Sequence, residues 1–508
     1  MKFQIENIGK IEFAEIELKP LTIFIGQNGS GKTYTATALW GVLNYINNLA
    51  NKSSSEQKDL APQEKNIIKN IKDIWENKFD RLINECLNTP NKEQSLIISK
   101  EEIINIHEQI NDYLKSNTSL ILGKVFNCDL FENPKLDFHN IELSDFKIVM
   151  IANTLPDEAF PLLEKLQSIV GVEHQNGVYI SDFSIKVSFS NKVIFDSKYF
   201  FFGLKDRLNQ DQQKKLKENI FYYLFLFSYF GKSGFDYNVK NLHYIPAART
   251  GLMFGLNSIL GESFKLSMNN MENNNNQNFA TINSGMPLPL NEFIYKIFSN
   301  TSRKNRVNKR TGEIVKDIKN ILDGIVVHKK DKKGFEFYPN KTNKSIPLSV
   351  TSSLVTELSA LSLFFDSTDA DKLPLIFFEE PEAHLHLSAQ KEIAKVITKM
   401  INQGYRMVIT THSATFLQQV NNLVLLNDLK DKKDLLRELD IDPKKETISK
   451  DKVAIYDFQC DDGRTKVVNV PFLKYGFVVE SLNKVLIKIS DETSSILEQI
   501  NLAQEGEI

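Results

Sequence analysis

A glycine-rich segment near the start of the chain carries a lysine and a hydroxyl residue at the spacing of a phosphate-binding loop. The segment GQNGSGKT, residues 26–33, fits the pattern G-x-x-x-x-G-K-[ST]. Its glycines let successive backbone N–H groups face an anion, while the lysine reaches the β- and γ-phosphates and the threonine hydroxyl binds Mg²⁺. An apolar run before it and a helical pattern after it argue against a chance match in a turn. The expected nucleotide-binding residues are Gly26, Asn28, Gly29, Ser30, Gly31, Lys32 and Thr33, with Thr33 also on the metal.

A second set of reactive side chains follows an apolar run, LIFFEE, at residues 375–380. ATP hydrolysis needs one acid near Mg²⁺ and one that orients the attacking water. We expect Glu379 to serve the metal and Glu380 to serve the water, although an acid pair at a strand end can also be plain surface. Glu382, His384 and His386 follow at once, but no further cluster supplies the ligands of a metal site. A loop that contacts the partner subunit's nucleotide is the preferred interpretation of these three residues.

Two further positions complete the candidate site. An apolar run at residues 407–411 ends at His412, and the carboxyl ends of parallel strands face the crevice where ligands bind. We expect His412 to be catalytic and to bond the γ-phosphate, with a structural histidine as the alternative. Ser352 and Ser353 precede an apolar helical pattern, so their helix presents free N–H groups that suit an anion. This helix start could meet the phosphate of a second subunit, or it could be an ordinary helix cap.

The elements that must position these residues alternate between strand and helix. Residues 1–25 have a strand pattern, and a helix is expected from about Thr33 to Leu49. Beyond residue 374 the alternation is regular, which predicts βαβ units and a parallel sheet. The fold class is therefore α/β. The five segments of this alternation, strand first, are Leu375–Phe378, Ala389–Asn402, Arg406–Thr410, Ala414–Val420 and Leu423–Leu426.

The chain has room for several structural units. We expect an ATPase domain from 1–50 and 235–440, a mainly helical insertion at 51–234, and a C-terminal α/β extension at 441–508. The insertion contains a strand pattern at 177–202 and an aromatic run at 220–230 that predicts a buried helix. Heptads are not sustained over 51–118, which argues against a long coiled coil there. Low complexity at 269–278 predicts a mobile loop.

Composition excludes several classes. The 508 residues carry a net charge of −2, so no global field draws the chain to nucleic acid or membrane. Its three cysteines are too few and scattered for a disulfide framework or zinc cluster, which fits a reducing cytoplasm. The N-terminus is no signal peptide, and the aromatic run is shorter than the ~20 residues that span a bilayer. We therefore expect a cytoplasmic protein without a membrane segment.

Three blocks of sequence together resemble the ATP-binding domains of the ABC superfamily, in the branch of RecF, the SMC proteins and the OLD family. The blocks are IENIGKIEFAEIEL before GQNGSGKT, then EEPEAHLH, then THS. The resemblance implies an ABC-type head with a mostly parallel sheet plus an antiparallel β lobe. It also implies a dimer that sandwiches two ATP molecules, with Ser352 or Ser353 entering from the second subunit. The serine block lacks the glycines of the usual LSGGQ. The resemblance implies that one subunit contributes five residues to each nucleotide site: Lys32, Thr33, Glu379, Glu380 and His412. It also makes Arg249, in YIPAART, a candidate phosphate sensor.

The part of the chain after His412 carries no Glu strand with an Asp-x-Asp pair, which the Toprim domain of OLD nucleases would need. Asp461 and Asp462 instead predict a hairpin turn before Gly463. The chain thus resembles stand-alone ATPase subunits of anti-phage systems such as Septu and PARIS, whose partner is a separate effector. An HNH or Toprim nuclease, or a toxin, is the expected partner. The alternatives are a DNA-repair or chromosome ATPase that acts on DNA, and a transport cassette.

A basic segment is the remaining candidate for nucleic-acid contact. Residues 303–344 contain thirteen Lys or Arg against five acids, a balance of +8. Ile325–Val327 and Phe335–Phe337 predict two strands joined by a turn near Gly334, with lysines at the tip. The segment could contact a nucleic-acid backbone or an acidic partner, or it could be solvated surface.

Overall fold

The computed structural model shows two compact units within the described part of the chain. The first comprises residues 1–43, 118–137 and 237–508, and the second comprises 44–117 and 138–236. The second unit thus differs from the predicted insertion at 51–234 in two ways: it also includes 44–50 and 235–236, and it lacks the segment 118–137, which belongs to the first unit. The described residues are 1–508 except 53–59, 130, 140–145, 155–178, 190–191, 205–213, 215–216, 219–220, 223, 227–228, 231–240, 254–285, 300–308, 330–333, 343, 368–373, 430–432 and 506–508.

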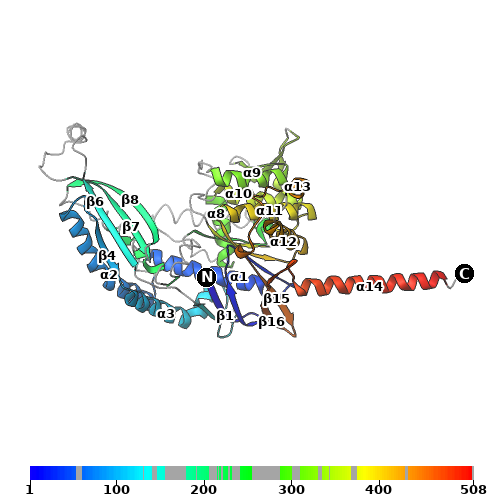
Figure 1. Ribbon diagram of the computed structural model, residues 1–508, viewed down its shortest axis with the longest axis horizontal. Coiled ribbons are helices and arrows are strands. Elements are labelled where there is room, and N and C mark those ends of the chain that lie inside the picture. Colours follow the sequence, from blue (N-terminus) through cyan, green and yellow to red (C-terminus); the bar gives the residue numbers. More distant parts are fainter. Residues whose placement is uncertain are drawn as a thin grey trace. The chain divides into compact units, whose positions relative to one another are not determined.

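A nine-stranded sheet organises the first unit (Figure 1). Its order is β5-β1-β2-β16-β15-β3-β14-β13-β9, and the five strands from β15 to β9 are parallel. β1 pairs with β2, and β15 with β16, in antiparallel fashion. The strands are β1 (Lys2–Ile8), β2 (Ile11–Glu17), β3 (Leu21–Gly26), β5 (Lys135–His139), β9 (Leu242–Ile245), β13 (Leu375–Glu379), β14 (Arg406–Thr411), β15 (Val453–Asp461) and β16 (Arg464–Asn469).

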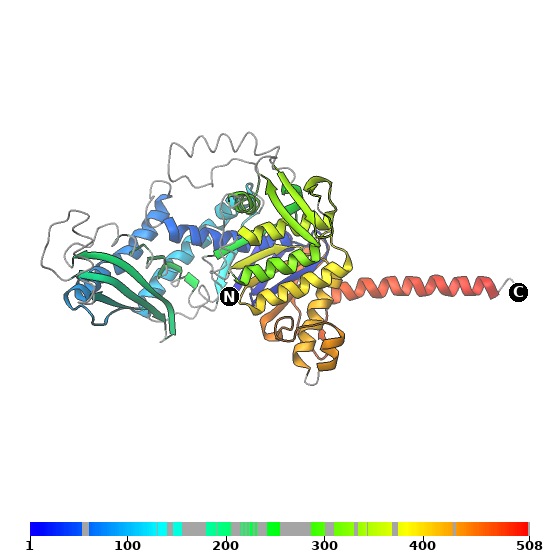
Figure 2. The same ribbon diagram turned by 90° about the horizontal axis from the view of Figure 1, so that it is seen from above.

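The parallel strands are buried because helices pack over them. Every residue of β3 and β13 is buried, which explains why both have continuous apolar sequences instead of alternating ones. The helices drawn from green to yellow lie side by side across the sheet in Figure 2, and they share one apolar core with the strands. The helices of this region are α1 (Lys32–Lys52), α8 (Leu288–Ser299), α9 (Lys309–Leu322), α10 (Ser353–Ser367), α11 (Leu387–Asn402), α12 (Ala414–Asp428) and α13 (Lys433–Glu438).

One predicted strand is wrong. Leu423–Leu426 is not a strand but the last part of α12. Asn421 lies inside this helix, and its side-chain oxygen accepts a hydrogen bond from Phe477 N at 3.0 Å. Leu423 and Val424 are fully buried at helical spacing from Val420, so tertiary packing overrides the local strand preference.

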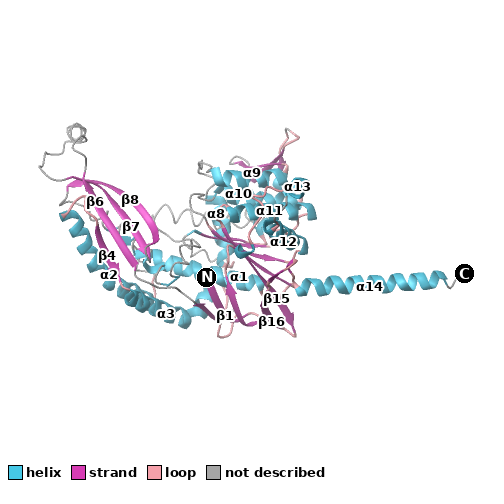
Figure 3. Ribbon diagram, in the orientation of Figure 1, coloured by secondary structure: helices cyan, strands magenta, loops and turns pink. Residues whose placement is uncertain are grey.

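The second unit combines two long helices with a separate antiparallel sheet, which Figure 3 shows in magenta. α2 (Pro62–Asn88) and α3 (Lys100–Phe126) belong to the predicted insertion, although the end of α3 lies in the first unit. The described residues of the aromatic run at 220–230 are helical, and those with described side chains are buried. The predicted α/β class, with a mostly parallel sheet, an antiparallel β lobe and a helical insertion, is confirmed. The sheet order is β4 (Gln94–Ile98), β6 (Phe146–Thr154), β7 (Tyr179–Phe189) and β8 (Lys192–Leu204).

Two hairpins match their predictions. Asp462 and Gly463 have φ angles of 44° and 81° and form the turn between β15 and β16. β10 (Gly324–Lys329) pairs with β11 (Gly334–Pro339), but the tip residues 330–333 and the arginines and lysines at 303–306 lie outside the described residues, as does 269–278. None of the described helices is long and apolar enough to cross a membrane. The remaining elements are β12 (Ile346–Pro347), β17 (Phe472–Leu473), β18 (Gly476–Phe477), α14 (Glu480–Glu505) and the 3-10 turns η6 (Leu348–Val350) and η7 (Lys450–Lys452).

Candidate functional site

The phosphate-binding loop lies between β3 and α1, in the first unit. Three of its glycines have positive φ angles, 147° at Gly26, 72° at Gly29 and 93° at Gly31, a region that other residues rarely adopt. Gly26 is constrained by packing as well, because an added Cβ would lie 2.4 Å from the Phe458 carbonyl oxygen. The backbone therefore takes the curled path that the motif predicted.

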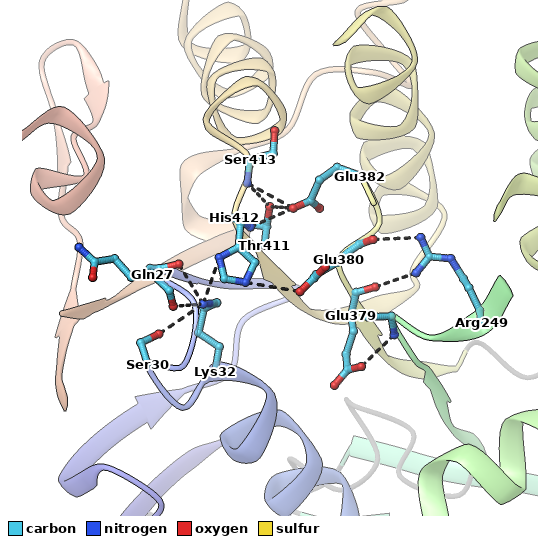
Figure 4. A network of polar contacts seen from close by, with 12 residues as sticks. Gln27, Ser30, Lys32, Arg249, Glu379, Glu380, Glu382, Thr411, His412 and Ser413 are labelled. Carbon is cyan, nitrogen blue, oxygen red and sulfur yellow. Dashed lines mark hydrogen bonds and ion pairs between the residues drawn. The ribbon is translucent and has the colours of Figure 1, made fainter. Parts of the chain in front are cut away.

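Lys32 is folded back over this loop (Figure 4). Its Nζ donates to the carbonyl oxygens of Gly26 at 2.9 Å and Gln27 at 2.7 Å, and it lies 3.3 Å from Ser30 Oγ. Burial lowers the Lys32 pKa to about 8, although Glu380 and other nearby acids favour the charged form. The ammonium is thus held by uncharged oxygens of the loop that the motif predicts to bind phosphate.

His412 connects Lys32 to Glu380. The Lys32 Nζ lies 3.5 Å from His412 Nδ1, and His412 Nε2 lies 3.4 Å from Glu380 Oε1. Since the ammonium can only donate, this geometry fits an imidazole whose proton is on Nε2 and faces the carboxylate. The bond to His412 lowers the Glu380 pKa. Three strand ends, those of β3, β13 and β14, therefore bring these side chains together (Figure 4).

Glu382 holds the backbone that carries His412. Its Oε1 accepts from Thr411 Oγ1 at 2.6 Å, His412 N at 2.9 Å and Ser413 N at 3.2 Å. Sequence reasoning missed this role and considered Glu382 only with the two histidines that follow it. His386 instead caps α11, with its Nδ1 accepting from Ser388 N at 3.3 Å. No group of three metal-binding side chains occurs in the described part of the chain.

Glu379 points away from Lys32 and toward the end of β9. Tyr244 Oη donates to its Oε1 at 2.5 Å, and Ala247 N donates to its Oε2 at 2.9 Å. Thr37 Oγ1 on α1 lies 2.8 Å from the same Tyr244 hydroxyl. Burial raises the Glu379 pKa. No signal in the sequence indicated the Tyr244 contact, because it depends on β9 becoming the neighbour of β13 in the sheet. The metal role of Glu379 and Thr33 stays a prediction.

Arg249 is fully buried behind the two acids. Its Nη1 donates to Glu379 O and its Nη2 to Glu380 O, each at 3.0 Å (Figure 4). Its Nε forms an ion pair with Glu357 Oε2 at 2.6 Å. The predicted phosphate-sensing role would require the guanidinium to leave these partners.

Ser352 and Ser353 lie at the start of α10, as predicted. The Ser352 Oγ accepts from Val355 N at 3.5 Å, and the Ser353 carbonyl accepts from Thr356 Oγ1 at 2.9 Å. Both serines are exposed. Within the described residues the hydrogen bonds of both serines stay at the start of α10.

One protein-family model matches this chain. The model described as AAA ATPase domain matches residues 1–417. No curated protein matches the chain. An Smc head bound to the C-winged helix domain of ScpA has a TM-score of 0.33 and 12% identity, covering 93% of this chain and 98% of that chain.

Two further SMC structures show the same level of likeness. The Smc head domain with an extended coiled coil from Pyrococcus furiosus, bound to the C-terminal domain of ScpA, has a TM-score of 0.31 and 11% identity over 96% of this chain and 98% of that chain. The SMC head domain from Thermotoga maritima has a TM-score of 0.29 and 8% identity over 92% and 98%. TM-scores this low establish neither a shared fold nor a shared function.

Proposed function

Because the chain belongs to the AAA ATPase domain family, we propose that it binds ATP and hydrolyses it to ADP and phosphate at the site of Lys32, Glu380 and His412. The observation that carries the proposal is the contact chain from Lys32 through His412 to Glu380, at the carboxyl ends of three neighbouring parallel strands. Ligands of open α/β sheets bind at such strand ends.

The three side chains suit separate tasks. The γ- and β-phosphates replace the carbonyl oxygens that now hold the Lys32 ammonium, and the loop N–H groups add further donors. Glu380 orients the attacking water, for which its carboxylate must be ionised, and the contact with His412, which lowers its pKa, favours this form. His412 lies between the two and bonds the γ-phosphate, so it registers whether that phosphate is present.

The oxygen donors near the loop fit Mg²⁺, which prefers hydroxyl and carboxylate oxygens. Thr33 is exposed at the start of α1, and the Glu379 carboxylate would hold the ion directly or through water. A bound Mg²⁺ would neutralise charge that develops on the phosphates. Tyr244 and Ala247 already orient the Glu379 carboxylate, so its position does not depend on the metal.

We place the complete site between two copies of the chain. Ser352 and Ser353 are exposed at a helix N-terminus, where free N–H groups favour an anion. Two large apolar side chains in this part of the fold are also exposed, Val350 by 71% and Leu387 by 59%. Val350 precedes the serines, and Leu387 follows the loop that carries His384 and His386. Exposed apolar residues beside a functional segment favour a subunit interface.

The test uses two substitutions that separate binding from hydrolysis. Lys32→Ala removes the charge that holds the phosphates and should abolish ATP binding. Glu380→Gln keeps the loop but loses the carboxylate that orients water, so it should bind ATP, stall hydrolysis and accumulate a dimer. Equilibrium binding, phosphate release and light scattering measure the three quantities. Hydrolysis by Glu380→Gln at the wild-type rate would refute the assignment of this residue.

For the biological role, we propose a bacterial anti-phage complex in which ATP binding by this subunit controls a separate nuclease or toxin. The support is the motif phrasing shared with stand-alone ATPases of such systems. Cells that express the chain with its neighbouring gene should reduce phage plaques, and Lys32→Ala should remove the protection. Equal protection by Lys32→Ala would contradict control by ATP.

Direct action on DNA is the second candidate, favoured by the basic segment at 303–344. An ATPase that acts on DNA should hydrolyse ATP faster when duplex DNA is added. An unchanged rate at saturating DNA would exclude this role and leave the effector-linked one.

A further inference from the structure

A buried arginine joins the two halves of the proposed catalytic arrangement. Arg249 follows β9, and its exposed fraction is 0%. Its guanidinium donates to the main-chain carbonyls of both acids at the end of β13, Glu379 and Glu380, each at 3.0 Å. A third bond, to Pro246 O at 3.2 Å, fixes the orientation of the guanidinium plane.

The other edge of the same guanidinium faces α10. Its Nε lies 2.6 Å from Glu357 Oε2, and both side chains are almost fully buried. Thr250, the next residue after Arg249, donates its hydroxyl to the second oxygen of Glu357. Glu357 lies one turn after Ser352 and Ser353, so this ion pair reaches the helix whose first residues we place in a second copy's site.

The local backbone explains why such a support is needed. Glu380 has a φ of 41°, which is unfavourable for a residue with a side chain and persists only where neighbours hold it. Its N–H donates to Thr410 O at 2.8 Å, and its carbonyl is held by Arg249. These two bonds set the direction in which the Glu380 carboxylate leaves the main chain toward His412.

Burying the Arg249–Glu357 ion pair costs free energy, and a contribution to stability does not by itself explain the pair. Removing two charges from water often costs more than their attraction returns, and apolar pairs of similar volume serve the fold as well. A guanidinium, however, presents several donors in one rigid plane, which an apolar side chain cannot replace. The ion pair is therefore suited to fixing the main chain of Glu379 and Glu380 relative to α10.

We propose that Arg249 and Glu357 are positioning residues that link α10 to the water-orienting Glu380 of the same chain. Contact of Ser352 or Ser353 with nucleotide on a second copy fixes α10, and the ion pair transfers that constraint to the main chain of Glu380. ATP hydrolysis at each site then depends on the contact between serines and nucleotide at the other site. This inference rests on the proposed ATPase function and adds that the two sites are coupled through one buried ion pair.

The experiment replaces both partners at once, as Arg249→Met with Glu357→Leu in the full chain. Removing one partner alone would leave a buried charge and could unfold the protein, whereas an apolar pair preserves the packing. The double variant should keep its affinity for ATP, and its thermal midpoint should fall only moderately, because three main-chain carbonyls lose their donor while the packing is preserved. Its hydrolysis rate at saturating ATP should fall on the order of 10²-fold, the usual effect of a small misplacement of a catalytic group.

Cooperativity supplies a readout that a purely structural pair would not change. The wild-type rate per chain should rise with protein concentration as copies engage, and the double variant should lose this rise. Arg249→Lys keeps the charge but loses the planar fork, so it should bind ATP normally and hydrolyse it slowly. The matched control is Lys399→Met with Glu446→Leu, an ion pair of 3.1 Å that does not contact the Lys32 site, and it should keep the wild-type rate.

Each result decides the question. A folded, ATP-binding double variant with the wild-type rate and concentration dependence would overturn the link alone. A double variant that fails to fold, while Arg249→Lys folds and hydrolyses ATP normally, would assign the pair to stability and also overturn it. A wild-type chain without Mg²⁺-dependent hydrolysis would overturn the proposed function and this link together.

Discussion

At the scale of single residues, proton binding decides how Lys32 can hold phosphate. Burial lowers its pKa from 10.5 to about 8, so the ammonium is mostly charged at neutral pH but loses its proton as the pH rises further. The phosphates of ATP favour the charged form and raise this pKa in the complex. Above pH 8, ATP binding must therefore take up a proton.

This linkage predicts that the association constant for ATP is nearly level below pH 7 and falls up to tenfold per pH unit above about pH 8. Calorimetry at pH 9 in two buffers of different ionisation enthalpy should detect uptake of about one proton. Lys32→Arg is the control, because arginine stays charged throughout this range. An association constant of the wild-type chain that is flat to pH 10 would show that the pKa is not lowered.

At the scale of elements, the loop after β13 and the loop after β14 are held together by one carboxylate. Glu382 Oε1 is the shared acceptor for donors of Thr411, His412 and Ser413. Its side chain is buried, so water cannot readily replace it. The position of His412 thus depends on a residue of the neighbouring loop.

Glu382→Ala should lower the free energy of unfolding by about 1–3 kcal/mol, because it leaves buried donors without an acceptor. ATP hydrolysis should fall as well, since the His412 backbone loses its support. Glu382→Gln retains an oxygen at the same place and should recover most of both properties. Urea unfolding and phosphate release are the measurements, and a Glu382→Ala variant as stable as the wild type would refute this role.

The β10–β11 hairpin is a second element with a defined prediction. Lys329 pairs with Gly334 at the end of the hairpin, and the residues between them, 330–333, lie outside the described part of the chain. If this tip contacts duplex DNA, each phosphate it neutralises adds ~0.9 to the slope of log affinity against log salt. Changing the tip lysines to glutamate should reduce both affinity and slope in the presence of a non-hydrolysed ATP analogue. The substituted residues are Lys329, Lys330, Lys332 and Lys333.

The control for the hairpin changes the same total charge at exposed lysines elsewhere and should leave the slope nearly unchanged. An equal slope for the wild type and the tip variant would show that the tip does not contact DNA. The control lysines are Lys466, Lys474, Lys484 and Lys488.

At the scale of the whole molecule, the serines of α10 do not contact the Lys32 network of their own chain among the described residues. If these serines act on ATP, as we propose, a second copy must supply them. Mixing a Lys32→Ala chain with a Ser352→Ala/Ser353→Ala chain leaves one site with both defects and one site intact. Partial recovery of ATP hydrolysis over either variant alone is expected if each site hydrolyses ATP by itself, whereas coupling of the two sites through Arg249 and Glu357 predicts no recovery.

Phosphate release measured against the mixing ratio tests this arrangement, and the mixed dimer is verified by two different affinity tags. Mixing two Lys32→Ala chains is the control and should recover nothing. Mixed dimers that remain inactive would contradict action in trans, unless the Arg249–Glu357 link makes each site depend on the other.

The local features of this protein follow from contiguous sequence. The phosphate-binding loop, the acids after β13, His412 after β14 and the turn at Asp462 all depend on residues adjacent in the chain. Glycine conformations, strand ends and turn types are decided by such short segments. The sequence thus predicted the α/β class and the segments that carry Lys32, Glu380 and His412 without knowledge of the strand order.

Only the tertiary structure decided which distant side chains meet. The contacts Glu382 with His412, Tyr244 with Glu379 and Arg249 with Glu357 join residues far apart in sequence, and each depends on which strands and helices become neighbours. The same reason explains the strand wrongly predicted at Leu423–Leu426, where packing against the core selects a helix. Local sequence sets what each segment can offer, whereas the order of β9, β13, β14 and β3 in the sheet determines which groups act together.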